Sequence, residues 1–127
     1  MLSFRGYIFS RKIDNNFIPH RVQNLVIKDY CEKKKYFFKL SATEYKMKNS
    51  YLMLNSLLKN LNKIDGIIFY SLFMLPQEKE QRNRIYKIII KKNKQIHFAL
   101  EDIQIKKLSD IYKIENIYQI KQNTKTI

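Results

Sequence analysis

The sequence has few of the residues that cross-link small proteins, bind metals or form phosphate loops. Its 127 residues include two glycines, two prolines and one cysteine. The single Cys31 excludes an internal disulfide and cannot build a zinc site, and neither His20 nor His97 belongs to a metal-ligand cluster. With Gly6 and Gly66 far apart, the chain lacks a glycine-rich phosphate loop. The sequence therefore indicates no metal and no cofactor.

Long apolar runs are also missing. The longest candidate, residues 64–76, contains Asp65, Tyr70 and Ser71, so it falls short of the roughly 20 apolar residues that a membrane helix needs. The N-terminal run is not followed by a small-residue cleavage site of the kind that ends a signal peptide. We therefore expect a soluble, cytoplasmic protein with no membrane span.

Acidic residues are scarce. Eleven Asp and Glu residues stand against 25 Lys and Arg, which gives a net charge of +14. Such an excess is typical of proteins that bind nucleic acid or anionic membranes. The lysines are scattered, however, and Lys, Ile and Asn all have AT-rich codons, so genome composition is a competing explanation. We favour a solvated lysine surface, with nucleic acid as the less favoured partner.

Apolar segments alternate regularly along the chain. Short apolar and aromatic runs predict strands at residues 4–9, 36–40, 67–69 and 95–100. Helical periodicity begins near Pro19, near Asn49 or Ser50, and near Pro76. The first helix is expected to bury one face that carries Val22, Leu25, Val26 and Tyr30.

The last 25 residues are harder to interpret. The pattern predicts a short strand at residues 103–105, a short helix from Ser109 to Ile114, and an edge strand at residues 117–120. We expect one domain over residues 1–122 and a frayed tail over residues 123–127.

This alternation predicts a single three-layer α/β domain with a mostly parallel sheet of four to five strands flanked by helices. In such sheets, ligands bind beyond the carboxyl ends of the strands, where the strand order reverses. We therefore expect a site there. Its expected ligand-binding residues are Arg11, Arg21, Gln23, Ser41, Tyr45, Tyr70, Ser71 and Glu101, and its expected catalytic residues are Ser10, Glu44 and His97.

Ser10 is the sharpest catalytic candidate because it ends the first strand. It can act as a nucleophile or a phosphate-binding hydroxyl, with Arg11 or Arg21 stabilising negative charge. The alternative, which the residues alone favour, is a serine that ends a strand and bonds nearby backbone.

The other candidates also have structural alternatives. Glu44 could move protons beside Tyr45, or it could cap the following helix. A buried, hydrogen-bonded role is favoured over catalysis for His97, because this histidine lies in the apolar run "IHFAL". The cluster around Phe73 and Met74 is typical of a core or of a partner surface, either for a second copy of the chain or for another enzyme.

Residues 6–100 resemble the catalytic domain of serine recombinases of the resolvase type, through "GYIFS", Gln23, "IKDYC" and "DGIIFYS". The resemblance implies a resolvase-like or flavodoxin-like fold and places Ser10 where the family keeps the serine that attacks DNA. That family also has an arginine two residues before the serine, where this chain has Ile8. It further carries an Asp-Arg pair and another arginine after the third strand, where this chain has "YSLFMLP". The resemblance therefore supports the fold and argues against the recombinase reaction.

The segments "RGYIFSR", "HRVQNLVIKDYCEK", "LSATEYKM", "DGIIFYSLFMLP" and "HFALE" together resemble the sporadic carbohydrate cluster protein family. That resemblance implies a role in making bacterial surface polysaccharide, such as O-antigen, exopolysaccharide or capsule. We therefore expect binding or modification of a sugar phosphate or nucleotide sugar, and leave open whether there is a reaction. A scaffold or regulator of a polysaccharide enzyme is one alternative. Nucleic-acid binding by a degenerate recombinase-like domain is the second.

Overall fold

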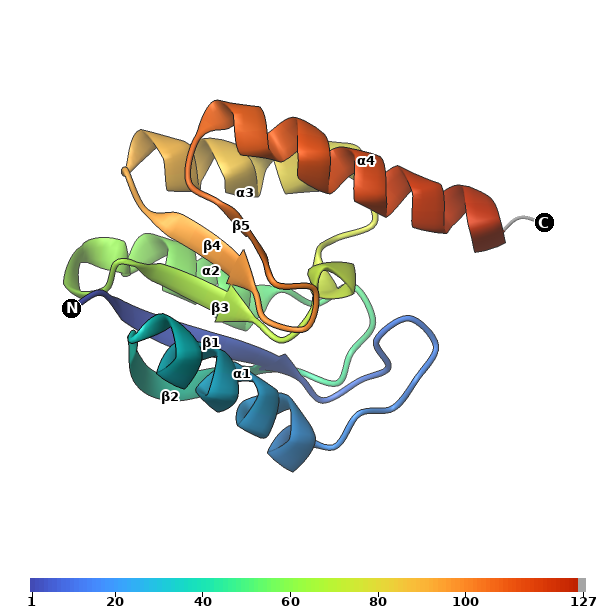
Figure 1. Ribbon diagram of the computed structural model, residues 1–127. Helices are drawn as coiled ribbons and strands as arrows, with labels where there is room; N and C mark the ends of the chain where they lie inside the picture. The colour runs from blue at the N-terminus through green and yellow to red at the C-terminus, as the bar shows by residue number, and fades with distance from the viewer. Residues whose placement is uncertain (126–127) are drawn as a thin grey trace.

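The computed structural model describes residues 1–125 and has a five-stranded sheet at its centre (Figure 1). The strand order is β2-β1-β3-β4-β5. The first four strands are parallel and β5 runs antiparallel to β4. The strands are β1 (Ser3–Phe9), β2 (Phe37–Glu44), β3 (Gly66–Phe69), β4 (Gln95–Phe98) and β5 (Ile103–Ile105). The predicted α/β class and mostly parallel sheet are confirmed.

Helices cover both faces of this sheet and complete the three layers. Helix α1 lies on one face, and α2 and α3 lie on the other, while α4 packs beside α3 and against β5 (Figure 1). The α-helices are α1 (His20–Lys34), α2 (Leu52–Lys59), α3 (Lys79–Lys91) and α4 (Leu108–Lys125), and the 3₁₀ helices are η1 (Leu61–Lys63) and η2 (Leu72–Met74). Over residues 1–125, none of the helices has the length and apolarity needed to cross a membrane.

Strand β3 is the centre of the core, as its apolar sequence predicts. All four of its residues are buried, because helices cover both faces of a parallel sheet. Gly66 begins the strand where a side chain would collide with the backbone carbonyl of Gln95 on β4. A glycine is therefore needed for the two strands to pair at this point.

Helix α1 buries only part of the predicted face: Tyr30 is buried and Val26 is half-buried, as expected, but the other two residues are not buried. Val22 and Leu25 are 41% and 56% exposed, whereas Gln23 and Ile27 are fully buried. The amide of Gln23 explains this orientation, since its oxygen accepts from the Phe9 N–H and its nitrogen donates to the Phe9 carbonyl, each at 2.9 Å. A polar residue therefore sets the rotation of the helix, and apolar periodicity could not show it.

The short strand predicted at residues 103–105 is confirmed as β5, but the predicted edge strand was wrong, because residues 117–120 belong to helix α4. Ile114 and Tyr118 are buried one turn apart. Glu115 accepts from the Arg82 side chain at 2.8 Å, which joins α4 to α3. The domain limits of 1–122 and the tail of 123–127 stay predictions: α4 runs to Lys125, and residues 126 and 127 lie outside the described residues.

Candidate functional site: a basic pocket at the carboxyl edge of the sheet

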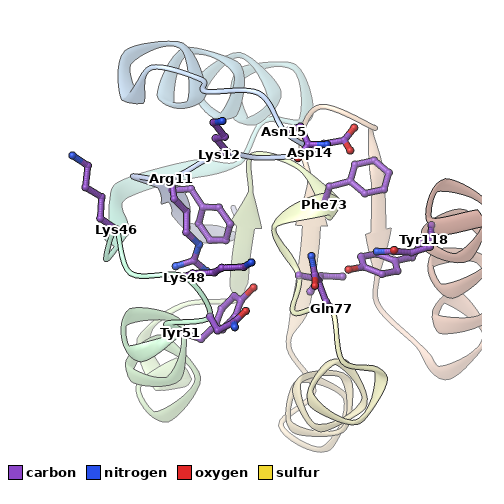
Figure 2. Close-up of a pocket in the computed structure, with 14 residues that line it drawn as sticks. Arg11, Lys12, Asp14, Asn15, Lys46, Lys48, Tyr51, Phe73, Gln77 and Tyr118 are labelled. Carbon is purple, nitrogen blue, oxygen red and sulfur yellow. The ribbon is translucent and has the colours of Figure 1, made fainter. Parts of the chain in front are cut away.

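The strand order reverses between β1 and β3, since β2 follows β1 on one side and β3 lies on the other. This is where open α/β sheets form a ligand crevice. A pocket of about 440 Å3 lies there (Figure 2). It is lined by Phe9, Arg11, Lys12, Asp14, Asn15, Lys46, Lys48, Asn49, Tyr51, Phe73, Leu75, Gln77, Tyr118 and Gln122.

Arg11 shapes the wall of this pocket that follows β2. Its Nη1 donates to three backbone carbonyls, those of Tyr45 at 3.0 Å and of Met47 and Ser50 at 2.9 Å each. Its guanidinium carbon lies 4.1 Å from the Phe9 ring centroid, within cation–π range. Arg11 was predicted to bind ligand, and most of its hydrogen bonds instead hold the loop of residues 45–50 in place.

Tyr51 closes the other side of the Arg11 guanidinium. The guanidinium carbon lies 4.9 Å from the centroid of the Tyr51 ring. Burial raises the pKa of Tyr51 above its usual range, and the charge of Arg11 opposes part of that rise. The phenol therefore stays neutral and adds no negative charge to the pocket.

The loop after β1 supplies the next part of the wall. Ile13 and Asn16 pair through two backbone hydrogen bonds of 2.8 and 2.9 Å, which close a tight turn. Asp14 and Asn15 occupy its centre with φ angles of 50° and 66°, a conformation that Asn and Asp tolerate. This turn places Lys12 and Asp14 at the pocket.

Positive charge dominates one side of the pocket. Lys12, Lys46 and Lys48 are all exposed there, beside the partly buried Arg11. Asp14 is the acidic residue in the lining, and its carboxylate lies 3.1 Å from the Lys121 ammonium. The pocket therefore presents several cations whose charge the local carboxylate does not cancel.

Aromatic and amide side chains form the opposite side (Figure 2). The rings of Phe73, after β3, and Tyr118, on α4, have centroids 6.2 Å apart. The Arg82 guanidinium carbon lies 4.0 Å from the centroid of the Tyr118 ring, within cation–π range. Gln77 adds an exposed amide to this side. Tyr118 is not among the predicted site residues, because the sequence pattern predicts a strand rather than a helix at residues 117–120.

A second, more open depression of about 580 Å3 lies on the β2 side of Ser10. Ser10 Oγ is 3.0 Å from Nε2 of His20, the first residue of α1. A hydroxyl at this distance from an imidazole has the geometry of a nucleophile and its base. His20 was absent from the predicted site, although it directly follows Pro19 at the start of the predicted helix.

Glu44 lines the depression beside Ser10 and is 1% exposed. Its carboxylate accepts from the Tyr7 hydroxyl at 2.8 Å and from the backbone N–H groups of Met53 and Leu54 at 3.0 Å each. A carboxylate at the first turn of a helix satisfies amide groups that have no partner within the helix. Glu44 thus caps α2, the alternative that the sequence analysis left open, and its capping bonds occupy both carboxylate oxygens.

His97 does not meet Ser10 or Glu44. It is fully buried, and its Nδ1 lies 2.6 Å from the Tyr30 hydroxyl while Nε2 lies 2.8 Å from Gln95 Oε1. Burial, helped by the charges of Lys106 and Lys34, lowers the pKa of His97 to about 3. The imidazole is therefore neutral at physiological pH and packed in the core.

Three other predicted ligand residues also form internal bonds. Ser71 Oγ donates to Glu101 at 2.7 Å, and Glu101 also accepts from the Leu72 N–H at 2.9 Å, which fixes η2. Ser41 donates to Asn24 at 2.6 Å. These side chains already have partners in the folded chain.

The remaining predicted residues differ in exposure. Tyr70 is 6% exposed, and its backbone joins the sheet edge. Arg21 and Tyr45 are exposed, and Tyr45 lines the depression beside Ser10. Ser10, Glu44 and Tyr45 are thus brought to one depression, whereas His97, Ser71 and the rest are not.

No family model matches the sequence, and no curated protein does. Solved structures do share the fold. The N-terminal catalytic domain of TP901-1 integrase matches with a TM-score of 0.67 and 12% identity, over 96% of this chain and 97% of that chain. A resolvase family site-specific recombinase from Streptococcus pneumoniae matches with a TM-score of 0.65 and 9% identity, over 95% and 89%. At these identities the likeness establishes the fold.

These matches correct the functional prediction. The expected role in surface-carbohydrate biosynthesis was wrong, as were the expected sugar phosphate, nucleotide sugar and polysaccharide-enzyme partners, because the matching domains are recombinases. The resemblance to the carbohydrate cluster family is not supported. One of its segments, "DGIIFYSLFMLP", contains the buried strand β3, and another, "HFALE", begins with the last two residues of β4, so both include apolar positions of the core. Met74, expected on a partner surface, is fully buried.

Proposed function

We propose that this domain binds duplex DNA at the carboxyl edge of its sheet through phosphate contacts, without the strand cleavage of a recombinase. The observation that carries the proposal is the gathering of Arg11, Lys12, Lys46 and Lys48 around one pocket from two separate loops. Cations grouped in this way attract a polyanion and release its condensed counterions. The neighbouring structures are domains of proteins that act on DNA sites, which agrees with such a ligand.

The second half of the proposal rests on burial. Ile8, where the recombinase pattern has an arginine, is 2% exposed. In the segment 70–76, which replaces the Asp-Arg pair and the following arginine, Met74 is fully buried and Leu75 is 1% exposed. These positions have joined the core. They cannot present charge to a phosphate at Ser10, so the phosphoryl transition state would lack the arginines that the recombinase pattern places at these positions.

Fluorescence anisotropy with a labelled blunt duplex at several salt concentrations tests the proposal. The variant Lys46→Gln/Lys48→Gln should bind more weakly at every salt concentration. The slope of log K against log salt should become shallower by about 2, because roughly one counterion is released per phosphate contact. A matched control, Lys59→Gln/Lys91→Gln, makes the same charge change at exposed lysines that end α2 and α3, near the opposite edge.

The control should keep the affinity and slope of the wild type within about twofold, the residual effect of losing two distant charges. Equal losses in both variants would show that the net charge, rather than this edge, binds DNA. A wild type that shows no duplex binding at low salt would overturn the proposal.

A further inference from the structure

The basic pocket has two chemically different sides. Figure 2 shows Arg11, Lys48 and Tyr51 on one side and Phe73, Gln77 and Tyr118 on the other. A duplex backbone needs only cations on an open surface. The aromatic side and the hollow between the two sides are therefore unexplained by phosphate contacts alone.

We infer that the pocket takes one unpaired nucleotide of the bound DNA strand, with its phosphate against the lysines and its base against the half-buried ring of Phe73. This inference rests on the proposed DNA binding and adds a preference for strand ends or unpaired bases. Base stacking on aromatic side chains beside a positively charged groove is how proteins hold single-stranded nucleic acid without reading its sequence.

The size and position of the pocket fit this ligand. Its volume of about 440 Å3 lies within the range of roughly 300–1,000 Å3 found for small-molecule sites. It also lies at the switch point between β1 and β3, where sheets of this type bind nucleotides. The pocket can thus hold a mononucleotide unit.

The chemistry of the walls assigns each part of the nucleotide. Lys12 and Lys48 offer ammonium groups for the phosphate, whereas Lys46 points away from the hollow and is available to the neighbouring DNA backbone (Figure 2). Phe73 is half-buried, with the Lys121 ammonium 5.8 Å from its ring centroid, so it is held in position and still lines the pocket. Gln77 offers an amide that can donate to or accept from a base edge.

The arrangement of the anchors suggests that the pocket is formed before the nucleotide arrives. Arg11 holds one wall through three carbonyls, and Arg82 holds the Tyr118 ring through a bidentate pair with Glu115 at 2.8 and 2.9 Å. Each of the two walls of the pocket is therefore held in place by an arginine that is buried or half-buried. Preformed walls reduce the entropy that a ligand would lose in ordering them.

The test compares a blunt duplex with the same duplex carrying three unpaired nucleotides at one end, the first of which is 2-aminopurine. Stacking on an aromatic ring should make the wild type prefer the overhang by at least about fivefold, and should quench the 2-aminopurine emission. The variant Phe73→Leu should lose that preference and much of the quenching, and should keep the affinity for the blunt duplex. Its control, Phe37→Leu, alters a 53% exposed phenylalanine that begins β2.

The outcomes separate the two proposals. Equal affinities for both duplexes, with unquenched 2-aminopurine, would overturn the nucleotide pocket and leave duplex binding intact. No binding of either duplex would overturn duplex binding and the pocket together. The 2-aminopurine emission is measured on the wild-type complex. The pocket can therefore still be tested if the Phe73→Leu protein fails to fold.

Discussion

The carboxyl edge of the sheet has two halves, and polar residues at the strand ends have different roles in each half. After β1 and β2 the chain forms the loops of residues 10–19 and 45–51, and the cations on them face a pocket. After β3 and β4 it turns at once, through residues 70–71 into η2 and through residues 99–102 into β5. Polar groups in this tight half bond to neighbouring backbone, as Glu101 does to the Leu72 N–H.

A polar residue at a strand end is available to a ligand only when the following loop moves away from the sheet. Ser10 and Ser71 illustrate the rule, since both are serines placed just beyond parallel strands. Ser10 is partly exposed and lies beside His20, whereas Ser71 is 1% exposed and caps η2. Substitutions in the tight half should therefore affect stability rather than binding. The open half contains both the exposed lysines, which should affect binding, and the buried Glu44, which should affect stability.

Glu44→Ala should have the largest effect, although Glu44 ends a strand in the open half. Removing its carboxylate leaves the Tyr7 hydroxyl and the amides of Met53 and Leu54 buried without their acceptor. We expect a loss of about 3 kcal/mol in the free energy of unfolding, measured by urea denaturation. Glu44→Gln keeps one acceptor oxygen and should lose less. If Glu44→Ala unfolds at the same urea concentration as the wild type, its capping role is wrong.

His97 should make stability depend on pH. Its pKa falls from 6.5 to about 3 on folding, so between these values the unfolded chain binds a proton that the folded chain does not. Stability should therefore fall with decreasing pH, by up to about 1.4 kcal/mol per pH unit from this one group. Denaturation at pH 4, 5, 6 and 7 measures the slope, and His97→Asn, which can still bond the Tyr30 hydroxyl, should reduce it. Equal slopes in the two proteins would show that other groups cause the dependence.

Ser71→Ala should have a smaller effect, confined to stability. It removes the hydrogen bond to Glu101 and the one that Ser71 Oγ accepts from the Phe73 N–H. The expected loss is about 1 kcal/mol in thermal or urea unfolding, with unchanged affinity for duplex DNA. A large loss of DNA affinity without a loss of stability would mean that the tight half also contacts the ligand.

Ser10→Ala should have the smallest effect. The hydroxyl is partly exposed, so its removal should change stability by less than about 0.5 kcal/mol. Duplex affinity should stay the same, and neither protein should form a covalent adduct with DNA on a denaturing gel. An adduct with the wild type that disappears in Ser10→Ala would show that the Ser10–His20 pair cleaves DNA, and would overturn the non-catalytic half of the proposed function.

Apolar patterns predicted most of the fold. The four parallel strands and the first three helices lie near their predicted places, because each carries an apolar run or a helical period. The predictions failed where a polar residue decides the structure. Gln23 rotates α1 toward the end of β1, and Glu44 lies in a strand that continues past the predicted end at residue 40. The hydrogen bonds of Gln23 to Phe9 and of Glu44 to the first turn of α2 cannot be predicted from hydrophobic periodicity.

Topology predicts the position of the candidate pocket, but it does not predict which residues line that pocket. The switch-point rule led to Ser10 and Arg11, and the pocket does lie beside them. The sequence favours a solvated surface for the lysines of the two loops, because these lysines are scattered along the chain. Lys12 and Lys46 share one pocket only after the sheet pairs β1 with β2, and no linear pattern encodes such a pairing.

The manner in which Arg11 holds the loop of residues 45–50 has an evolutionary consequence. The hydrogen bonds go to the carbonyl oxygens of Tyr45, Met47 and Ser50, so they do not depend on which side chains the loop carries. Mutation can therefore exchange the residues between these anchors without remodelling the backbone that displays them. Because one arginine fixes the backbone of this loop, substitutions in the loop can change ligand preference while the fold stays the same.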